Sequence, residues 1–374
     1  MKLILITVIL IAVYIIQREI YNTYWNRRLT TSLKFSKEYL ECGEKGKLVE
    51  TITNDKFLPL PVFQFKFSVD RALKFDDMEN SNVTDNYHRN DIFSILGHQR
   101  ITRKLDFTAT ERGIYKVEGA TLLVKDFFLS SQFAEAVQVD SRVFVFPRKM
   151  DVSKIDNVFR GILGEINSKR SLIEDRLTYR GMRDYRTTDS FRTINWKQSA
   201  KASQLKVNVY DYTMDAQVKI MLNLDTDSMI RTNTLIEESI SIVSSACRKF
   251  LRAKISVDVV SNGLDINKEV ITLPGNGAEN SHGITIDKYL ASIAKSSGSK
   301  EFLKMLDKEI MKAEDRILYL IISPYHKKDL LSKIDEMNKN GLYVSMIVPY
   351  YDQIGYTPER ECIHGWEVSL TDAS

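Results

Sequence analysis

A continuous apolar run near the N-terminus dominates the pattern of hydrophobic and polar positions. Leu3 to Ile16 reads LILITVILIAVYII, with Lys2 before it and Arg18 close behind it. The run is short for a bilayer, which needs about 20 helical residues. However, the residues after it lack the small-x-small cleavage site of a signal peptide, and flanking basic and aromatic side chains suit a headgroup layer. We therefore predict one transmembrane anchor within residues 1–25, while the charges on its two sides leave its orientation open.

The next region, residues 26–148, shows the two-residue period of half-buried strands. In Val62 to Asp70, VFQFKFSVD, the Phe and Val side chains alternate with polar ones, which places them on one face of a strand. Several such segments without intervening helices predict a β-sandwich. The polar stretch Asp76–Asn90 is predicted to be a loop, with His88 and His98 as surface residues.

From residue 216 to 374 apolar strands alternate with helical patterns. Val218 to Leu224 and Ile317 to Ile322 are almost wholly apolar, which is typical of strands buried on both faces. Cys247 falls on the apolar stripe of the helix predicted between these strands, so we interpret it as a small core residue. This order predicts a doubly wound, mainly parallel α/β sheet, with ligands beyond the carboxyl ends of its strands. Asp225 lies at one such end.

A basic, aromatic connector at residues 149–215 joins the two regions. Between residues 169 and 206, ten basic residues against four acidic ones leave a net charge of +6, with Trp196 among several interleaved aromatic residues. One interpretation is a structural Arg/Asp network with Trp196 buried. The others are a docking site for an acidic protein, or for nucleic acid or anionic lipid. We favour the first, which is compatible with the second.

Composition narrows the class of protein. The 374 residues are 43% hydrophobic and 27% charged, which excludes a disordered or multi-span membrane chain. A net charge of +4 is too small to indicate a nucleic-acid partner. The three cysteines are widely spaced and include no CxxC, which argues against disulfides and structural zinc.

The connector carries a long motif. Arg183 to Asp211, RDYRTTDSFRTINWKQSAKASQLKVNVYD, followed by LNLDTDSM, resembles the signature of domain-of-unknown-function family 58, roughly R-E-Y-x-x-G-D-x-x-R-x-I-D-W-x-x-S-A-R. ERGIYKV, KDFF and VFPR resemble upstream landmarks of that family. Thr188 and Asn195 replace its Gly and Asp. The matching positions that we take as candidate interaction residues are Arg183, Tyr185, Asp189, Arg192, Trp196 and Ser199.

The resemblance implies a fold and a partner. It implies a β-sandwich joined to a von Willebrand factor A-like domain. It also implies work with a MoxR-type AAA+ ATPase, which is cytosolic, so the bulk of the chain would be cytoplasmic. Members of the family usually have two N-terminal spans, whereas this sequence has one apolar run.

An A-type domain can hold Mg²⁺ through D-x-S-x-S after its first strand. Here Asp225 and Asp227 keep oxygen ligands, but Met229 offers a thioether, and Mg²⁺ prefers hard oxygen ligands. Ser323 stands where a later Asp is usual. Asp225 and Asp227 are therefore weak metal candidates, and we predict no resident cofactor; the alternative is that they cap the next segment or line a cleft.

No catalytic motif stands out. Cys362 and His364 are close in sequence but lack a visible orienting group. We predict a non-enzymatic, single-pass membrane adaptor that acts with the ATPase on other membrane or envelope proteins and does not bind nucleic acid. The alternatives are an extracellular adhesion module that depends on a divalent ion and, less favoured, a cysteine hydrolase.

Overall fold

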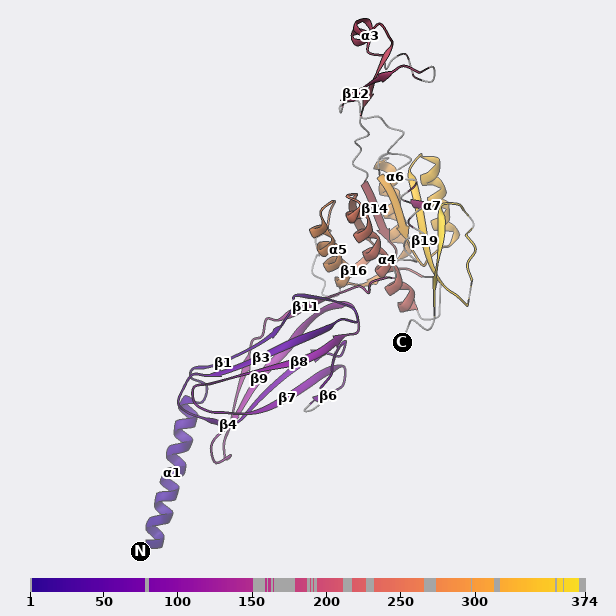
Figure 1. Cartoon of the computed structure of the whole chain (residues 1–374). Coiled ribbons are helices and arrows are strands. Elements are labelled where there is room, and N and C mark those ends of the chain that lie inside the picture. Colours follow the sequence, from indigo (N-terminus) through magenta and orange to yellow (C-terminus); the bar gives the residue numbers. More distant parts are fainter. Residues whose placement is uncertain are drawn as a thin grey trace. The chain divides into compact units, whose positions relative to one another are not determined.

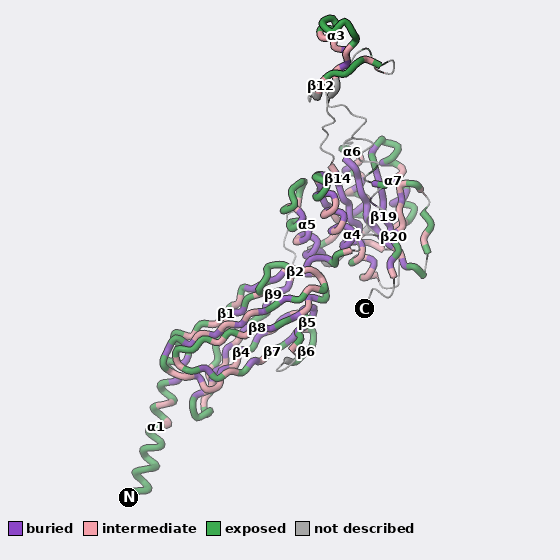
Figure 2. Tube along the Cα trace, in the orientation of Figure 1, coloured by how far each residue is buried: buried purple, intermediate pink, exposed green. Residues whose placement is uncertain are grey.

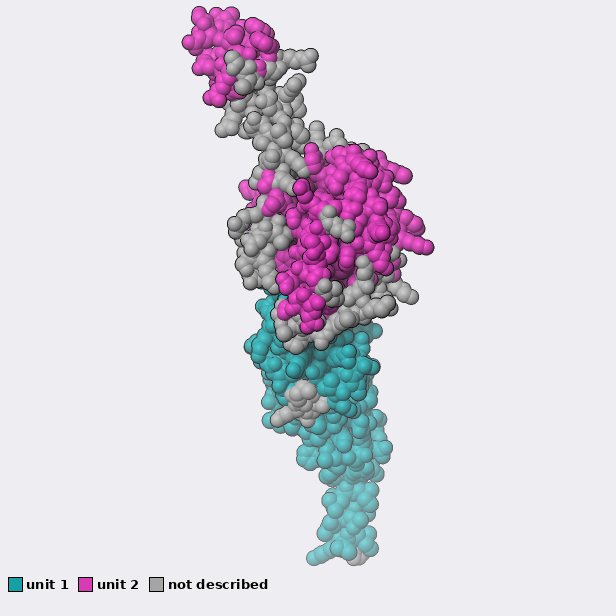
Figure 3. Space-filling model, turned by 90° about the vertical axis from the view of Figure 1, so that its right-hand side faces the viewer, with its two compact units in different colours: residues 1–149, 290–292 teal, residues 150–289, 293–374 magenta. Residues whose placement is uncertain are grey.

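The protein is a multidomain, β-rich chain with an apolar N-terminal helix, seen in a computed structural model (Figure 1). The structure describes residues 2–77, 81–150, 159, 161, 162, 164, 179–186, 189, 191, 194–210, 217–226, 232–265, 274–296, 298–312, 317–353, 355–358 and 360–369. Two compact units divide it, coloured in Figure 3: residues 1–149 with 290–292, and residues 150–289 with 293–374.

Two sheets form the first unit. The four-stranded sheet has the order β1-β3-β8-β5. The larger, seven-stranded sheet has the order β2-β11-β9-β4-β7-β6, with β10 also on β9. The bounds are β1 Leu29–Phe35, β2 Tyr39–Glu41, β3 Lys45–Asn54, β4 Leu60–Asp70, β5 Leu73–Phe75, β6 Ser81–Val83, β7 Asn86–Ile95, β8 Gln99–Ala109, β9 Gly113–Lys125, β10 Gln132–Val137 and β11 Arg142–Phe146. Side chains of both sheets share one core, as in a β-sandwich.

Strand β4 confirms the predicted alternation, because Phe63, Phe65, Phe67 and Val69 are all buried. The prediction of a loop at Asp76–Asn90 is wrong, since β6 and most of β7 occupy its described part. The inward positions of β7 carry charged residues as well as apolar ones. For that reason the stretch does not show the apolar alternation by which a strand is detected.

Helix α1, Lys2–Tyr24, packs along the sandwich with one face of its second half. The Tyr14 ring lies 6.2 Å from Phe128, and the Gln17 amide nitrogen donates to Asp126 at 3.2 Å. One and two turns further on, Tyr21 and Trp25 are buried in the sandwich core. Spacings of three or four residues keep these side chains on one helix face. The first half is exposed (Figure 2), and among the described helices α1 is long and apolar enough to cross a membrane.

A parallel five-stranded sheet forms the centre of the second unit, in the order β15-β14-β18-β19-β20. Helix α4 contacts four of these strands, and α7 contacts β19 and α6. Right-handed crossovers place the helices that follow β14 and β18 on opposite faces. The bounds are β14 Gln217–Leu222, α4 Thr232–Arg252, β15 Ser256–Ser261, α5 Asn280–Ser292, α6 Ser299–Lys312, β18 Ile317–Ile322, α7 Lys328–Lys339, β19 Tyr343–Tyr351 and β20 Ile363–Val368.

Two small antiparallel strand pairs complete the described structure. β16 (Gly263–Asp265) pairs with β17 (Ile293–Ser296), and β12 (Tyr179–Asp184) pairs with β13 (Lys206–Tyr210). A short helix, α3 (Trp196–Ala202), precedes β13. The family-like motif therefore lies on β12, α3 and β13, which we call the motif hairpin.

Candidate functional site

An Arg–Asp pair organises the motif hairpin. Both terminal nitrogens of Arg183 donate to the carboxylate of Asp189, at 2.6 and 2.7 Å. The backbone N–H of Arg186 also donates to Asp189, at 2.8 Å. The Arg183 bonds and then the Arg186 bond lower the pKa of Asp189 to about 2. Two predicted motif residues are thus brought together in a two-pronged ion pair, which fixes geometry well.

The motif hairpin leaves two aromatic side chains, Phe191 and Trp196, exposed. Tyr185 stacks on Phe191 with ring centroids 5.8 Å apart, and Phe191 itself is 69% exposed. Trp196 is 64% exposed. The expectation of a buried Trp196 is therefore wrong. The reason is local: Trp196 is the first residue of α3, a helix whose one buried residue is Ser199.

Ser199 and Asn195 fasten α3 to β13. The Ser199 hydroxyl donates to the Asn195 carbonyl at 2.8 Å and accepts from the Lys206 N–H at 2.8 Å. The Asn195 side chain caps α3 by accepting from the Gln198 N–H at 3.1 Å, a role that an Asp also performs. These motif residues are structural, whereas Arg192 lies outside the described residues.

A hydrogen-bond network closes the carboxyl edge of the parallel sheet. The Asn223 amide donates to Ser323 Oγ at 3.0 Å, which joins the ends of β14 and β18. The Asn262 amide, just after β15, donates to Asn223 Oδ1 at 2.8 Å and to Asp225 Oδ2 at 3.2 Å. Asn262 also accepts from the Leu224 N–H at 2.9 Å. This is the point where the strand order reverses, and such a crevice often binds ligands.

The donors at this edge do not fit Mg²⁺. Asp225 is the one carboxylate that the structure describes there, because Asp227 and Met229 lie outside the described residues. The neighbouring amides already bond to one another, and Ser323 donates to the Tyr325 carbonyl at 2.7 Å. Across the described parts of the chain, no three His, Cys, Asp or Glu side chains gather into a metal-binding group. Asp225 here serves a network of amides, whereas Mg²⁺ requires several hard oxygen ligands.

The cysteines show no sign of activation where the structure describes them. Cys247 is buried in α4, as predicted, and burial raises the pKa of its thiol well above the usual value. Cys362 accepts from the Asn338 amide at 3.7 Å. His364 is two residues further along, on β20, where it pairs in register with Ile347. The arrangement seen here does not present a thiolate with a general base.

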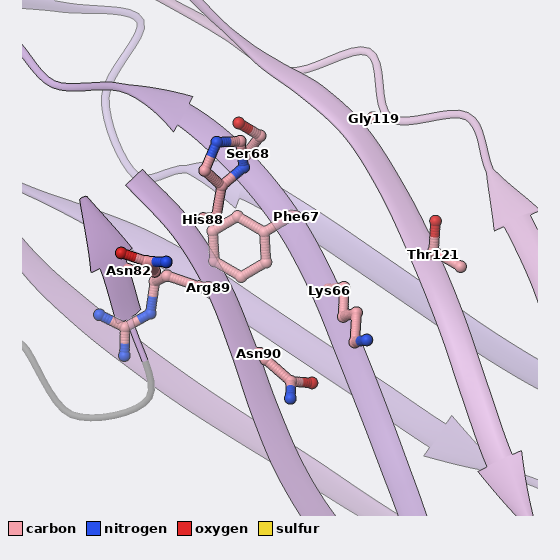
Figure 4. Close-up of a pocket in the computed structure, with 9 residues that line it drawn as sticks. All are labelled: Lys66, Phe67, Ser68, Asn82, His88, Arg89, Asn90, Gly119 and Thr121. Carbon is pink, nitrogen blue, oxygen red and sulfur yellow. The ribbon is translucent and has the colours of Figure 1, made fainter. Parts of the chain in front are cut away.

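An open groove lies on the outer face of the large sheet (Figure 4), with a volume of about 640 Å³. Its polar side chains come from β4, β6, β7 and β9, and none of the described residues that line it is a carboxylate. The side-chain oxygens of Ser68 and Asn90 are buried without a hydrogen-bond partner. Gly119, at a bulge between β4 and β9 with φ +62°, leaves open space where a side chain would project. The groove suits polar or anionic groups by its chemistry.

Between the two sheets lies a charged cluster that the sequence pattern did not indicate. Arg103 donates to Asp91 and to Asp77, each at 2.8 Å, and Arg89 is fully buried beside Asp91. Glu50 on β3 is 1% exposed, and neither of its carboxyl oxygens has a hydrogen-bond partner among the described residues. Burial, and then the charge of Asp91, raises the pKa of Glu50 to about 8. The carboxyl is therefore mostly protonated at neutral pH.

Comparisons with known proteins identify no family. No family model matches the chain, and no curated protein matches it. The CARDB domain of a Pyrococcus furiosus protein is 13% identical, over 30% of this chain and 91% of that one, with a TM-score of 0.19. A non-cellulosomal cohesin from Archaeoglobus fulgidus is 14% identical, over 31% and 91%, with a TM-score of 0.21. A cohesin module from Clostridium perfringens is 12% identical, over 30% and 99%, with a TM-score of 0.20. At these TM-scores the likeness supports no inference about function.

Proposed function

We propose that this chain is a membrane-anchored, non-enzymatic interaction protein that works with a MoxR-type AAA+ ATPase on other membrane or envelope proteins. The motif hairpin is the observation that carries the proposal. It holds the residues that resemble domain-of-unknown-function family 58, and it exposes four apolar side chains: Met182, Phe191, Trp196 and Leu205. Exposed aromatic side chains beside a fixed Arg–Asp pair have the chemistry of interface anchors.

Anchorage in a membrane is supported by the way α1 joins the sandwich. A cleaved signal sequence leaves the mature protein, but Tyr21 and Trp25 at the end of α1 belong to the sandwich core. Removing them would open that core. Retention of α1 as a single span therefore agrees with the packing, and the cytosolic partner places the bulk of the chain on the cytoplasmic side in this proposal.

The α/β domain serves in this proposal as a von Willebrand factor A-like binding module. Support comes from the parallel sheet and from a carboxyl edge filled by Asn223, Asn262 and Ser323. A network that satisfies its own donors fixes the loops above the sheet, which is the requirement of a docking surface. The same network offers no nucleophile paired with a base, so we assign the domain no reaction.

Co-purification tests the proposal. The full chain, co-expressed with a MoxR-type AAA+ ATPase and extracted in detergent, should retain that ATPase above the level seen with an unrelated single-span protein. Trp196→Ala should weaken binding by about 30-fold or more, the effect of losing an anchor residue. Its melting temperature should stay unchanged because Trp196 is exposed.

Met311→Ala provides the matched control, since Met311 is 84% exposed on α6 and lies outside the motif. It should leave both ATPase binding and melting temperature unchanged. Failure of the wild-type chain to enrich the ATPase would contradict the partner. Full binding by Trp196→Ala would contradict the assignment of the motif hairpin as the docking surface. A thermal shift with Mg²⁺ would instead favour the ion-dependent adhesion alternative.

A further inference from the structure

The turn between β9 and β10 presents apolar side chains beside α1. Phe127, Phe128 and Leu129 are each more than half exposed. Asp126 holds the turn in shape, because its carboxylate accepts from the N–H and hydroxyl of Ser130, both at 2.6 Å. Burial alone would raise the pKa of Asp126, but these bonds, a further one from the Ser131 N–H and the charge of Arg18 together outweigh it and lower the pKa. Exposed apolar side chains on a braced turn indicate a surface made for a partner.

Two further turns at the α1 end of the sandwich also expose an apolar side chain each. Phe57, between β3 and β4, is 88% exposed, and Leu96, between β7 and β8, is also exposed. The two turns are joined through the Asn54 amide, which donates to the Leu58 and Leu96 carbonyls at 3.0 and 2.9 Å. The Tyr21 hydroxyl donates to the Pro59 carbonyl at 2.8 Å, which fastens this pair of turns to α1.

The position of the β9–β10 turn beside α1 indicates what covers this turn. Phe128 contacts Tyr14, and its N–H donates to Gln17 Oε1 at 3.3 Å. Tyr14 lies within the apolar run of α1, so the turn reaches the level of that run. Arg18 follows the run, and Lys125 precedes the turn. Basic side chains at this level suit lipid phosphates.

The length of α1 also indicates that the turns beside it contact the bilayer. Its part free of the sandwich, Leu3 to Val13, has 11 residues and rises roughly 16 Å at 1.5 Å per residue. A hydrocarbon core is about 30 Å thick. The free part is therefore about half as long as a span needs. If α1 crosses a bilayer, the docked residues after Val13 must enter it too, and the turns packed beside them must follow.

We propose that Phe57, Leu96, Phe127, Phe128 and Leu129 form a lipid-contacting collar, which enters the bilayer together with α1. The collar rests on the proposed anchorage by α1. Its occupant is phospholipid, because the collar continues the apolar surface of α1 and basic side chains accompany it. A second protein chain in the same place is the rival outcome.

Site-specific photo-cross-linking tests the collar in the full chain. A benzophenone amino acid replaces Phe127 or Phe57 in separate variants reconstituted into phosphatidylcholine–phosphatidylglycerol vesicles. Both sites are exposed, so the fold should tolerate the probe. Ile9 on the free part of α1 is the positive control. Val83, exposed on β6 and paired with Tyr87 at the opposite end of β7, is the matched control away from the membrane end.

We expect lipid adducts, detected by mass spectrometry, at Ile9, Phe127 and Phe57, and only background at Val83. No adduct at Ile9 would disprove the anchorage on which the collar rests. An adduct at Ile9 with background at Phe127 and Phe57 would disprove the collar alone. Adducts of protein mass at Phe127 would assign the surface to another chain and overturn the lipid proposal.

Discussion

Glu50 lowers the stability of the sandwich at neutral pH, and Glu50→Gln should remove that cost. Burial raises the pKa of this carboxyl from the usual 4.5 to about 8. At a pH above the usual pKa of 4.5, Glu50 is ionised in the unfolded chain, whereas in the folded chain its carboxyl keeps the proton. The free energy of unfolding therefore falls as pH rises, by about 1.4 kcal/mol per pH unit until the folded pKa is reached. The loss is about 3 kcal/mol at pH 7 and approaches about 5 kcal/mol above pH 8.

Glutamine keeps the shape of the protonated side chain but cannot ionise, so the variant should lack this slope. Hydrogen exchange of peptides from β3 and β8 measures local opening in the full chain, after correction for the intrinsic pH dependence of exchange. Between pH 5 and pH 8 the opening free energy of the wild type should fall by several kcal/mol. That of Glu50→Gln should stay nearly constant. Peptides from β18 give an internal reference.

Glu111→Gln is the matched control, because Glu111 is an exposed carboxylate of the same sandwich. It should follow the wild type across the whole pH range. Equal slopes for wild type and Glu50→Gln would refute the reasoning, since the buried carboxyl would then ionise as freely in the folded chain as in the unfolded one.

Other substitutions probe the remaining features. Lys219→Met removes one partner of the buried Glu309, at 2.9 Å, while Lys312 remains at 3.2 Å, and should cost about 1–3 kcal/mol in thermal unfolding; adding Glu309→Leu should recover part of the loss, and no recovery would contradict the pairing. Asn262→Ala leaves the buried Leu224 N–H unpaired and should cost about 1–3 kcal/mol by the same measurement. Leu129 has φ +58°, so Leu129→Gly should raise stability in detergent by about 1 kcal/mol, and a lower melting temperature would argue against backbone strain there.

The sequence predicts those strands in which apolar residues occupy the buried positions and polar residues the exposed ones. Strand β4 and the buried strand β18 have the alternating and continuous apolar patterns expected for them. Strand β7 escaped prediction because Arg89 and Asp91 face inward. Charged residues are normally taken as exposed, and only the facing strand reveals that they pair within the core.

For the carboxyl edge of the parallel sheet, the sequence predicts where Asp225 lies but not the residues that bond to it. Asp225 was expected at the end of a strand, and it lies there. Its neighbours Asn223 and Asn262 were missed, because single amides between apolar residues carry no spacing signal. The sequence predicts Trp196 inside the protein as part of a structural Arg/Asp network. No local pattern shows that a helix of seven residues leaves it outside.

The absence of a flexible joint between α1 and the sandwich has a mechanical consequence. Four successive contacts, at Tyr14, Gln17, Tyr21 and Trp25, bind the second half of the helix to the domain. We therefore expect α1 and the sandwich to move together as one rigid body. Any torque applied to the sandwich is transmitted directly to the helix as tilt, and any change in helix tilt reorients the sandwich.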